Sequence, residues 1–219
     1  MPITLKDALV FTLKWEGTVF TDHPNDYGGP TRYGIIQRVY DRYRRSKGLP
    51  VRSVNFITEP EYNEIYEKNY WNPVRSEWLS GPLGLTLFDT AVNLGVGGAL
   101  SRLQAALKLP ITGTWTQNIS DVIHSADQTA IALTICNLRI KKRHDRVKQN
   151  PTQKVFLKGW LNRDRDLIRK VKSLAGLATG FDFEDLSEIN EDFDQDVLDE
   201  IENFDEDIIH QIEKYDEDK

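Results

Sequence analysis

Apolar residues that recur every three or four positions are the feature that most limits how this sequence can fold. Such spacing places apolar side chains on one face of a helix, and it extends through most of the 219 residues. Runs that alternate between apolar and polar residues, as half-buried strands do, are few. We therefore predict a mostly α-helical fold.

Capping residues and breaks at glycine and proline mark the ends of the predicted helices. Thr4 and Asp7 have the spacing of a capping box, and the first helix is expected to end near Glu16. Residues 17–34 are rich in glycine and proline, which predicts a loop or a short hairpin. Further helices are expected over residues 33–44, 58–71, 88–94, 99–107, 127–143 and 151–171.

The sequence offers little for redox or metal chemistry. Cys136 is the single cysteine, so an intramolecular disulfide framework is excluded. We interpret it as a small buried residue on a helix rather than a nucleophile, since no base accompanies it. The four histidines are scattered without metal-ligand spacing. Neither a metal nor any other cofactor is expected.

Charge divides the chain into a basic body and an acidic tail. Residues 1–180 carry 16 acidic and 26 basic side chains, a net charge of +10, whereas residues 181–219 carry 18 acidic side chains and two lysines, a net charge of −16. A basic body suits a polyanionic surface such as nucleic acid, anionic lipid or bacterial cell wall. Because no helix-turn-helix or RNA-binding signature is present, nucleic acid is not an expected partner.

The acidic tail is predicted to form an amphipathic helix. Its apolar residues step by three or four positions, a stripe that a purely solvated acidic segment would lack. They are Ile189, Phe193, Val197, Ile201, Phe204, Ile208, Ile212 and Tyr215. The stripe must be buried on the basic body, on a second copy of the chain or on a protein partner. One hypothesis is that the tail folds over the body and restrains activity or nonspecific binding.

A carboxylate next to a Gly/Pro-rich loop marks the candidate site. Glu16 follows Trp15, and the loop after it contains a second acid, Asp26, and then Thr31. Hydrolysis of a glycosidic bond needs one carboxylic acid that a partly apolar setting keeps protonated, and a second polar group in a wetter setting. The pattern therefore suits a glycosidase.

Each of these residues also has a purely structural interpretation. Glu16 could end its helix in an ion pair with Arg32, and Asp26 could cap the turn before Tyr27. Thr31 could form a side-chain turn instead of positioning a water or a sugar.

Several motifs, in order along the chain, resemble glycoside hydrolase family 108. They are the segment from Glu16 to Ile35, Tyr70-Trp71, the run from Phe88 to Gly95, Leu103-Gln104, Gly113 to Thr116, and Gly159 to Arg163. That family comprises muramidases, often phage endolysins, with a lysozyme-like helical lobe followed by a small peptidoglycan-binding region. The resemblance extends from about residue 5 to about residue 172 and does not cover the acidic tail.

The resemblance implies a division of the chain and an activity. Residues 1–108 would form the lysozyme-like catalytic lobe, residues 109–180 a helical peptidoglycan-binding region packed on it, and residues 181–219 remain as the acidic tail. The implied activity is hydrolysis of the β-1,4 bond between N-acetylmuramic acid and N-acetylglucosamine. The implied partner is bacterial peptidoglycan, and no membrane insertion is expected.

The resemblance also assigns roles within the candidate site. Glu16 matches the catalytic glutamate of the family and would be the general acid. Related phage-type lysozymes place an acid nine residues and a threonine fifteen residues after that glutamate. Thr31 stands at fifteen, whereas Asn25 stands at nine and Asp26 at ten. We take Asp26 as the second carboxylate, because a loop can absorb one extra residue.

Five further residues complete the predicted site as substrate-binding positions: Tyr33, Gly34, Trp71, Asp89 and Asn93. Tyr33 and Gly34 are expected to form the floor of the cleft, where the glycine allows a close backbone approach. For Trp71, sugar stacking and a place in the core are both open. Asp89 and Asn93, four residues apart on one helical face, would either contact substrate or form a buried hydrogen-bonded pair that orients the cleft.

The sequence also predicts a cellular route. No secretory signal is visible, so we expect synthesis in a cytoplasm and action on the cell wall after release, by a holin-type or a virion-borne route. The alternative is a lysozyme-like wall-binding or structural protein with weak or lost catalysis, whose acidic tail docks a partner.

Overall fold

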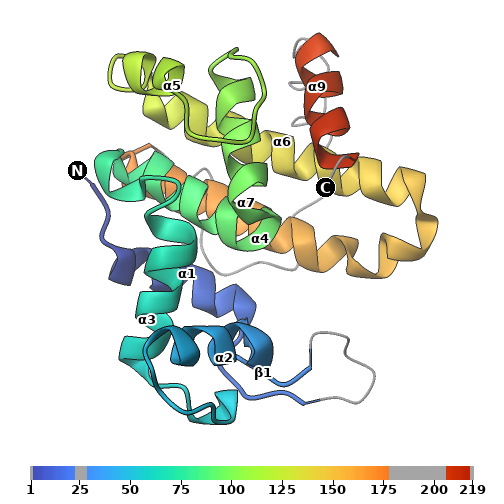
Figure 1. Cartoon of the computed structure of the whole chain (residues 1–219). Coiled ribbons are helices and arrows are strands. Elements are labelled where there is room, and N and C mark those ends of the chain that lie inside the picture. Colours follow the sequence, from blue (N-terminus) through green and yellow to red (C-terminus); the bar gives the residue numbers. More distant parts are fainter. Residues whose placement is uncertain (1, 23–28, 178–205, 218–219) are drawn as a thin grey trace. The chain divides into compact units, whose positions relative to one another are not determined.

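The computed structural model describes residues 2–22, 29–177 and 206–217 (Figure 1). Helices dominate these residues, and their β structure is one short two-stranded hairpin. The predicted mostly α, lysozyme-like fold with a small hairpin is confirmed. The chain divides into two compact units, Thr4–Pro73 and Val74–Lys219 with Met1–Ile3.

The unit Thr4–Pro73 holds the candidate acid. Its elements are α1 (Leu5–Glu16), β1 (Thr31–Arg32), β2 (Ile35–Ile36), α2 (Gln37–Ser46), η1 (Val54–Phe56), α3 (Glu59–Tyr66) and η2 (Glu67–Trp71). Helix α1 begins as predicted, because the Thr4 side chain accepts a hydrogen bond from the Asp7 backbone N–H at 3.2 Å. It ends at Glu16, where Gly17 takes a φ of 80° and closes the helix.

The hairpin corrects one predicted boundary. A helix was expected from Tyr33, but α2 begins at Gln37. Tyr33 and Gly34 have φ angles of 51° and 69°, and both are therefore left-handed. Two such residues form the tight turn between β1 and β2, in which Arg32 pairs with Ile35.

The second unit is built on three long helices that contact one another, α4 (Gly81–Ala106), α6 (Gln128–Gln149) and α7 (Lys154–Leu174). Its shorter elements are η3 (Ser76–Trp78), α5 (Gln117–Val122), η4 (Pro151–Gln153) and α9 (Glu206–Glu217). Asp127 caps α6 as expected, accepting hydrogen bonds from the backbone N–H groups of Thr129 and Ala130. Cys136, on α6, is buried, and burial raises the pKa of its thiol to about 12, so it is a core residue.

Helix α4 joins two segments that were expected to be separate helices. The chain stays helical from Gly81 to Ala106 except at Gly95, whose φ of 80° and ψ of 160° break the regular geometry. By length and composition α4 could cross a membrane, with a mean hydropathy of 1.3 over an 18-residue window. Since 67% of that window is buried inside the protein, α4 fits the role of a core helix. The compact units divide between Pro73 and Val74, inside the expected lobe 1–108, and the domain boundary at residue 108 stays a prediction.

The described part of the acidic tail is helical and docked. Helix α9 contacts α4, and Ile212 is buried against Ala105 and Leu138. At Ile212 the apolar stripe is therefore buried on the basic body, one of the three expected places, and Ile208 is partly buried beside it. Five stripe positions lie outside the described residues: Ile189, Phe193, Val197, Ile201 and Phe204.

Candidate active site

Glu16 occupies the last turn of α1 and is half-buried. A carboxylate at this end of a helix faces the negative end of the helix dipole, which is unfavourable for stability. The preceding residue, Trp15, is also half-buried, and the ammonium group of Lys14 lies 5.3 Å from the centre of its ring. The end of α1 therefore places Glu16 at the start of the loop that carries the other candidate residues.

The hairpin turn brings the backbone of Gly34 directly against Glu16. A Cβ atom added to Gly34 would lie 2.9 Å from Glu16 Cβ and 3.1 Å from Glu16 Oε2. It would also lie 2.8 Å from the hydroxyl oxygen of Tyr66. No side chain fits in this space, and the φ of 69° also favours glycine. The close backbone approach expected at Gly34 is present, and the group it approaches is the candidate acid.

Tyr66 holds this turn in place. Its hydroxyl donates a 2.7 Å hydrogen bond to the backbone carbonyl of Tyr33, and its side chain is 1% exposed. Tyr70 lies beside it, with ring centroids 5.7 Å apart and the ring planes tilted by 41°. Burial raises the pKa of Tyr70, and the charge of Glu16 raises it further, so Tyr70 is within electrostatic reach of the acid. Tyr66 was not among the predicted site residues; a tyrosine rather than a phenylalanine at a core position was the available signal.

Thr31 lies at the centre of the short β structure. Its backbone exchanges two hydrogen bonds with Thr21, of 2.9 and 2.8 Å, and it pairs with Ile36 across the hairpin. Its hydroxyl donates to the carbonyl of Gly29 at 2.8 Å and can still accept a hydrogen bond. The hydroxyl thus bonds to the preceding loop rather than to a following turn, and it keeps an acceptor for water. Asp26 and Asn25 lie outside the described residues.

The aromatic candidates differ in accessibility. Trp71 is 4% exposed, which favours its place in the core of this unit over sugar stacking. Tyr33 is half-buried, and its ring lies 4.6 Å from that of Tyr62 and 5.1 Å from the guanidinium carbon of Arg32. The Arg32 guanidinium also donates to the carbonyl of Asn55.

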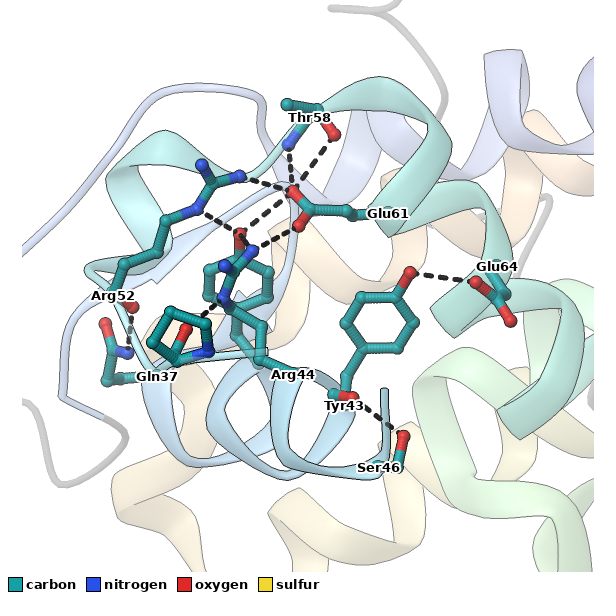
Figure 2. A network of polar contacts seen from close by, with 10 residues as sticks. Gln37, Tyr43, Arg44, Ser46, Arg52, Thr58, Glu61 and Glu64 are labelled. Atoms are coloured by element: carbon teal, nitrogen blue, oxygen red, sulfur yellow. Dashed lines mark hydrogen bonds and ion pairs between the residues drawn. The ribbon is translucent and has the colours of Figure 1, made fainter. Parts of the chain in front are cut away.

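A polar network between α2 and α3 stiffens the same unit (Figure 2). Glu61 is its centre, accepting from Arg44 at 2.7 Å and from Arg52 and the backbone N–H of Thr58 at 2.8 and 2.9 Å. The hydroxyl of Tyr40 donates to it at 2.9 Å. Burial alone would raise the pKa of Glu61, but these hydrogen bonds outweigh burial and lower it to about 2.

Asp89 and Asn93 belong to the second unit, where they join a buried ion network. The Asp89 carboxylate is fully buried and accepts from Arg139 and Arg163, each at 2.8 Å. Burial opposes its ionisation, but the charges of the two arginines prevail and lower its pKa to about 2. Arg143 donates to the Asn93 carbonyl oxygen and, at 3.1 Å, to Asp164. This favours buried hydrogen bonding over substrate contact for Asp89, with Arg139 and Arg163 as ion-pair partners.

Within the described ranges, no three His, Cys, Asp or Glu side chains are grouped as metal ligands would be. In the first unit, the structure brings Glu16, Tyr33 and Gly34 together and adds Tyr66 and Tyr70 to them. This arrangement can hold a carboxylic acid at the edge of a rigid turn, with aromatic rings on one side. That is what proton donation to a glycosidic oxygen requires.

Comparison with known proteins agrees with this chemistry. Residues 9–95 match the family Glycosyl hydrolase 108, a span that contains Glu16, the hairpin and the helices up to the break in α4. The protein is therefore a glycoside hydrolase of the muramidase type. More particularly, residues 9–95 are similar to family 108, and that similarity implies lysozyme-like hydrolysis of peptidoglycan.

The fold is similar to that of Brucella abortus SagA, with a TM-score of 0.65 and 24% sequence identity. The match covers 78% of this chain and 95% of the SagA chain. At this identity the likeness concerns the fold alone. No match was found among curated proteins.

Proposed function

We propose that this protein is an N-acetylmuramidase that cleaves the β-1,4 bond between N-acetylmuramic acid and N-acetylglucosamine. The observation that carries the proposal is the placement of Glu16 against the Gly34 turn, inside the segment that matches family 108. Glu16 donates a proton to the leaving glycosidic oxygen. Asp26, Thr31 or both stabilise the oxocarbenium-like transition state or hold the attacking water.

The fixed turn supports this assignment of the acid. A general acid must be within about 3 Å of the oxygen that it protonates, so small displacements of its carboxyl group lower the rate. The carboxylate of Glu16 stands against backbone atoms of Gly34, and the Tyr66 hydroxyl fixes the neighbouring peptide. Such packing limits the positions that the Glu16 carboxyl group can take.

The rest of the chain has a binding role in this proposal. Residues 109–180 form the peptidoglycan-binding region, and the basic surface of residues 1–180 concentrates the enzyme on an anionic wall. Attraction of this kind is screened by salt, so wall binding is expected to weaken as ionic strength rises.

The decisive experiment compares the wild type with Glu16→Gln on purified peptidoglycan. The release of new reducing ends is measured, and the fragments are identified by mass spectrometry. We expect muropeptides that end in reducing N-acetylmuramic acid from the wild type, and a rate at least about a hundredfold lower from Glu16→Gln. Glu67→Gln, at an exposed glutamate of the same unit, is the matched control and keeps full activity.

Two other outcomes of this experiment would indicate a different function. Fragments that end in reducing N-acetylglucosamine would assign the enzyme to the other glycosidic bond. Wall binding without bond cleavage by either protein would favour the lysozyme-like binding protein that has lost catalysis.

We also propose an endolysin-type route, in which the enzyme is made in a cytoplasm and reaches the wall after release. It rests on analogy with the family. Expression in a bacterial host with and without a holin tests it, since lysis is expected only when the holin is present. Lysis at the same rate without the holin would contradict it.

A further inference from the structure

Helix α9 fills a shaped surface on α4 and α6. Ile212 is 6% exposed and packs against Ala105 and Leu138, with Ile111 and Ile208 at the edge of the same cluster. An acidic helix that stays in solvent would not need an apolar contact surface of this kind. Burial of one Ile side chain contributes roughly 1.5–3 kcal/mol, so this contact favours docking without any charge.

Tyr215 extends the contact to two glycines. A Cβ atom added to Gly97 would lie 2.1 Å from the Tyr215 hydroxyl oxygen, and one added to Gly113 would lie 2.0 Å from it. The tyrosine therefore occupies space that any other residue at these two positions would fill. Gly113 is in the turn held by Gln104, whose side-chain oxygen accepts from the Gly113 backbone N–H at 3.0 Å.

Two carboxylates of α9 face three cations of the body. Asp216 accepts from Arg102 through both oxygens, at 2.6 and 3.3 Å, and also from Lys142. Glu213 lies 3.7 Å from Lys141. Because residues three apart on a helix share a face and are separated by about 4.5 Å along its axis, the cations bind two successive anionic groups.

Arg102 makes this surface dependent on an anion. Its side chain is 1% exposed, and Asp216 is the only carboxylate with which it forms a salt bridge in the described parts of the chain. A buried cation without a counter-ion is strongly destabilising. Burial works against ionisation of Asp216, but Arg102 and Lys142 outweigh it and lower the pKa of this carboxyl group. If α9 leaves, the site must admit either water or another anion.

The groove extends beyond the ion pairs. A cavity of about 270 Å³ borders α9 and is lined on the body side by Leu138 and by a row of polar and charged residues of α6. These residues are Lys141, Lys142, Asp145, Arg146 and Gln149. Lys141, which lies near Glu213, also pairs with Asp145 of the same helix at 2.6 Å. Arg146 adds a further cation to the lining of this cavity.

We propose that this groove, centred on Arg102, Lys141 and Lys142, is a binding site for linear polyanions and that α9 occupies it as an intrachain competitor. The carboxylates of Glu213 and Asp216 stand in for successive anionic groups of a polymer. Taking the polymer from the cell wall rests on the proposed function. Polyol phosphates and uronic acid polymers share the required chemistry, one anionic group on each short repeat. Arginine binds carboxylate and phosphate in the same bidentate manner.

The competition has a measurable consequence. While α9 is seated, only the fraction of molecules with an open groove binds polymer, and the apparent affinity falls by that fraction. A full-length variant that undocks α9 without any change in charge should therefore bind polymer more tightly. Ile212→Ala combined with Tyr215→Ala is such a variant, because it removes the two apolar anchors and leaves every ion-pairing group in place.

The test measures binding of poly(glycerol phosphate) and of polyglucuronate to the full-length proteins at low salt. Hydrogen exchange of residues 206–217 reports whether α9 is released. We expect the double variant to bind at least one of the polymers about tenfold more tightly than the wild type, and the preferred polymer identifies the source. In that background Lys142→Gln removes most of the gain, whereas Lys158→Gln, at an exposed lysine of α7, does not.

A second variant is used in case the double alanine variant does not release α9 completely. Asp216→Lys places a cation against Arg102 and Lys142, and Asp121→Lys is its charge-matched control on α5. The proposal is overturned if α9 exchanges freely but neither polymer binds more tightly. It is also overturned if the controls Lys158→Gln and Asp121→Lys change polymer binding as much as Lys142→Gln and Asp216→Lys do. Because no bond cleavage is measured, failure here is distinct from failure of the muramidase proposal.

Discussion

The hydroxyl of Tyr66 donates a 2.7 Å hydrogen bond to the backbone carbonyl of Tyr33, 33 residues earlier in the chain. Tyr33 has a left-handed φ of 51°, which is unfavourable for a side chain of this size. The bond thus holds a strained turn whose next residue, Gly34, lies against Glu16. Tyr66 is a positioning residue for the acid rather than a catalytic residue.

Tyr66→Phe should therefore lower kcat about tenfold with little change in KM, because the acid loses its fixed turn while the binding surface persists. We also expect a loss of about 1 kcal/mol in the free energy of unfolding. Steady-state kinetics on soluble peptidoglycan fragments and urea titration measure the two effects.

Tyr43→Phe is the matched control for this change. The Tyr43 hydroxyl donates to Glu64 at 2.8 Å in the same unit. It should cost comparable stability and leave kcat unchanged. Equal kcat values for the two phenylalanine variants would show that Tyr66 acts only on stability.

Gly34→Ala should abolish most of the activity. The new methyl group meets the Cβ of Glu16 at 2.9 Å, so Glu16 or the turn must move. We expect at least about a hundredfold loss in kcat/KM, measured by reducing-end release. Gly48→Ala has a similar φ of 68° but nothing within 4 Å, so it should share the backbone strain of about 1–2 kcal/mol and retain activity. Inactivity of both alanine variants would attribute the loss to unfolding.

Glu61→Gln should destabilise the α2–α3 network by roughly 2–4 kcal/mol, because Arg44 is buried and loses its counter-ion. The pKa of Glu61 is lowered from 4.5 to about 2, so its ionised form stabilises the fold above pH 4.5. That stability is lost as the pH falls from 4.5 to about 2. Urea titrations from pH 7 to pH 2 should show this loss in the wild type and a weaker one in Glu61→Gln. If both proteins lost the same stability between pH 4.5 and pH 2, Glu61 would not be the cause of the acid sensitivity.

Asp89→Asn should be a stability variant. It leaves Arg139 and Arg163 buried beside a neutral side chain, at a cost of about 3–5 kcal/mol. Thermal unfolding should show a large fall in Tm, whereas Asp121→Asn at an exposed position should show none. For the folded fraction we expect an unchanged KM. A raised KM at an unchanged Tm would instead support direct contact between Asp89 and the substrate.

Local signals in the sequence predicted much of the fold. The Thr4 cap, the Asp127 cap and the helix end at Glu16 could be identified because each depends on residues within about four positions of one another. The close approach at Gly34 could also be anticipated, since only glycine tolerates it. The hairpin boundary was missed because nothing local marks Tyr33 as left-handed.

The tertiary structure decided which groups face one another. Asp89 meets Arg163 from 74 residues away, and Arg102 meets Asp216 from 114 residues away. Periodicity shows that a residue lies on a buried or a charged face, but it does not give the partner of that face. The sequence alone thus determined the helices, the basic body and the acidic stripe. Only the packing of distant segments decided that Tyr66 holds the turn at Glu16 and that α9 lies on α4 and α6.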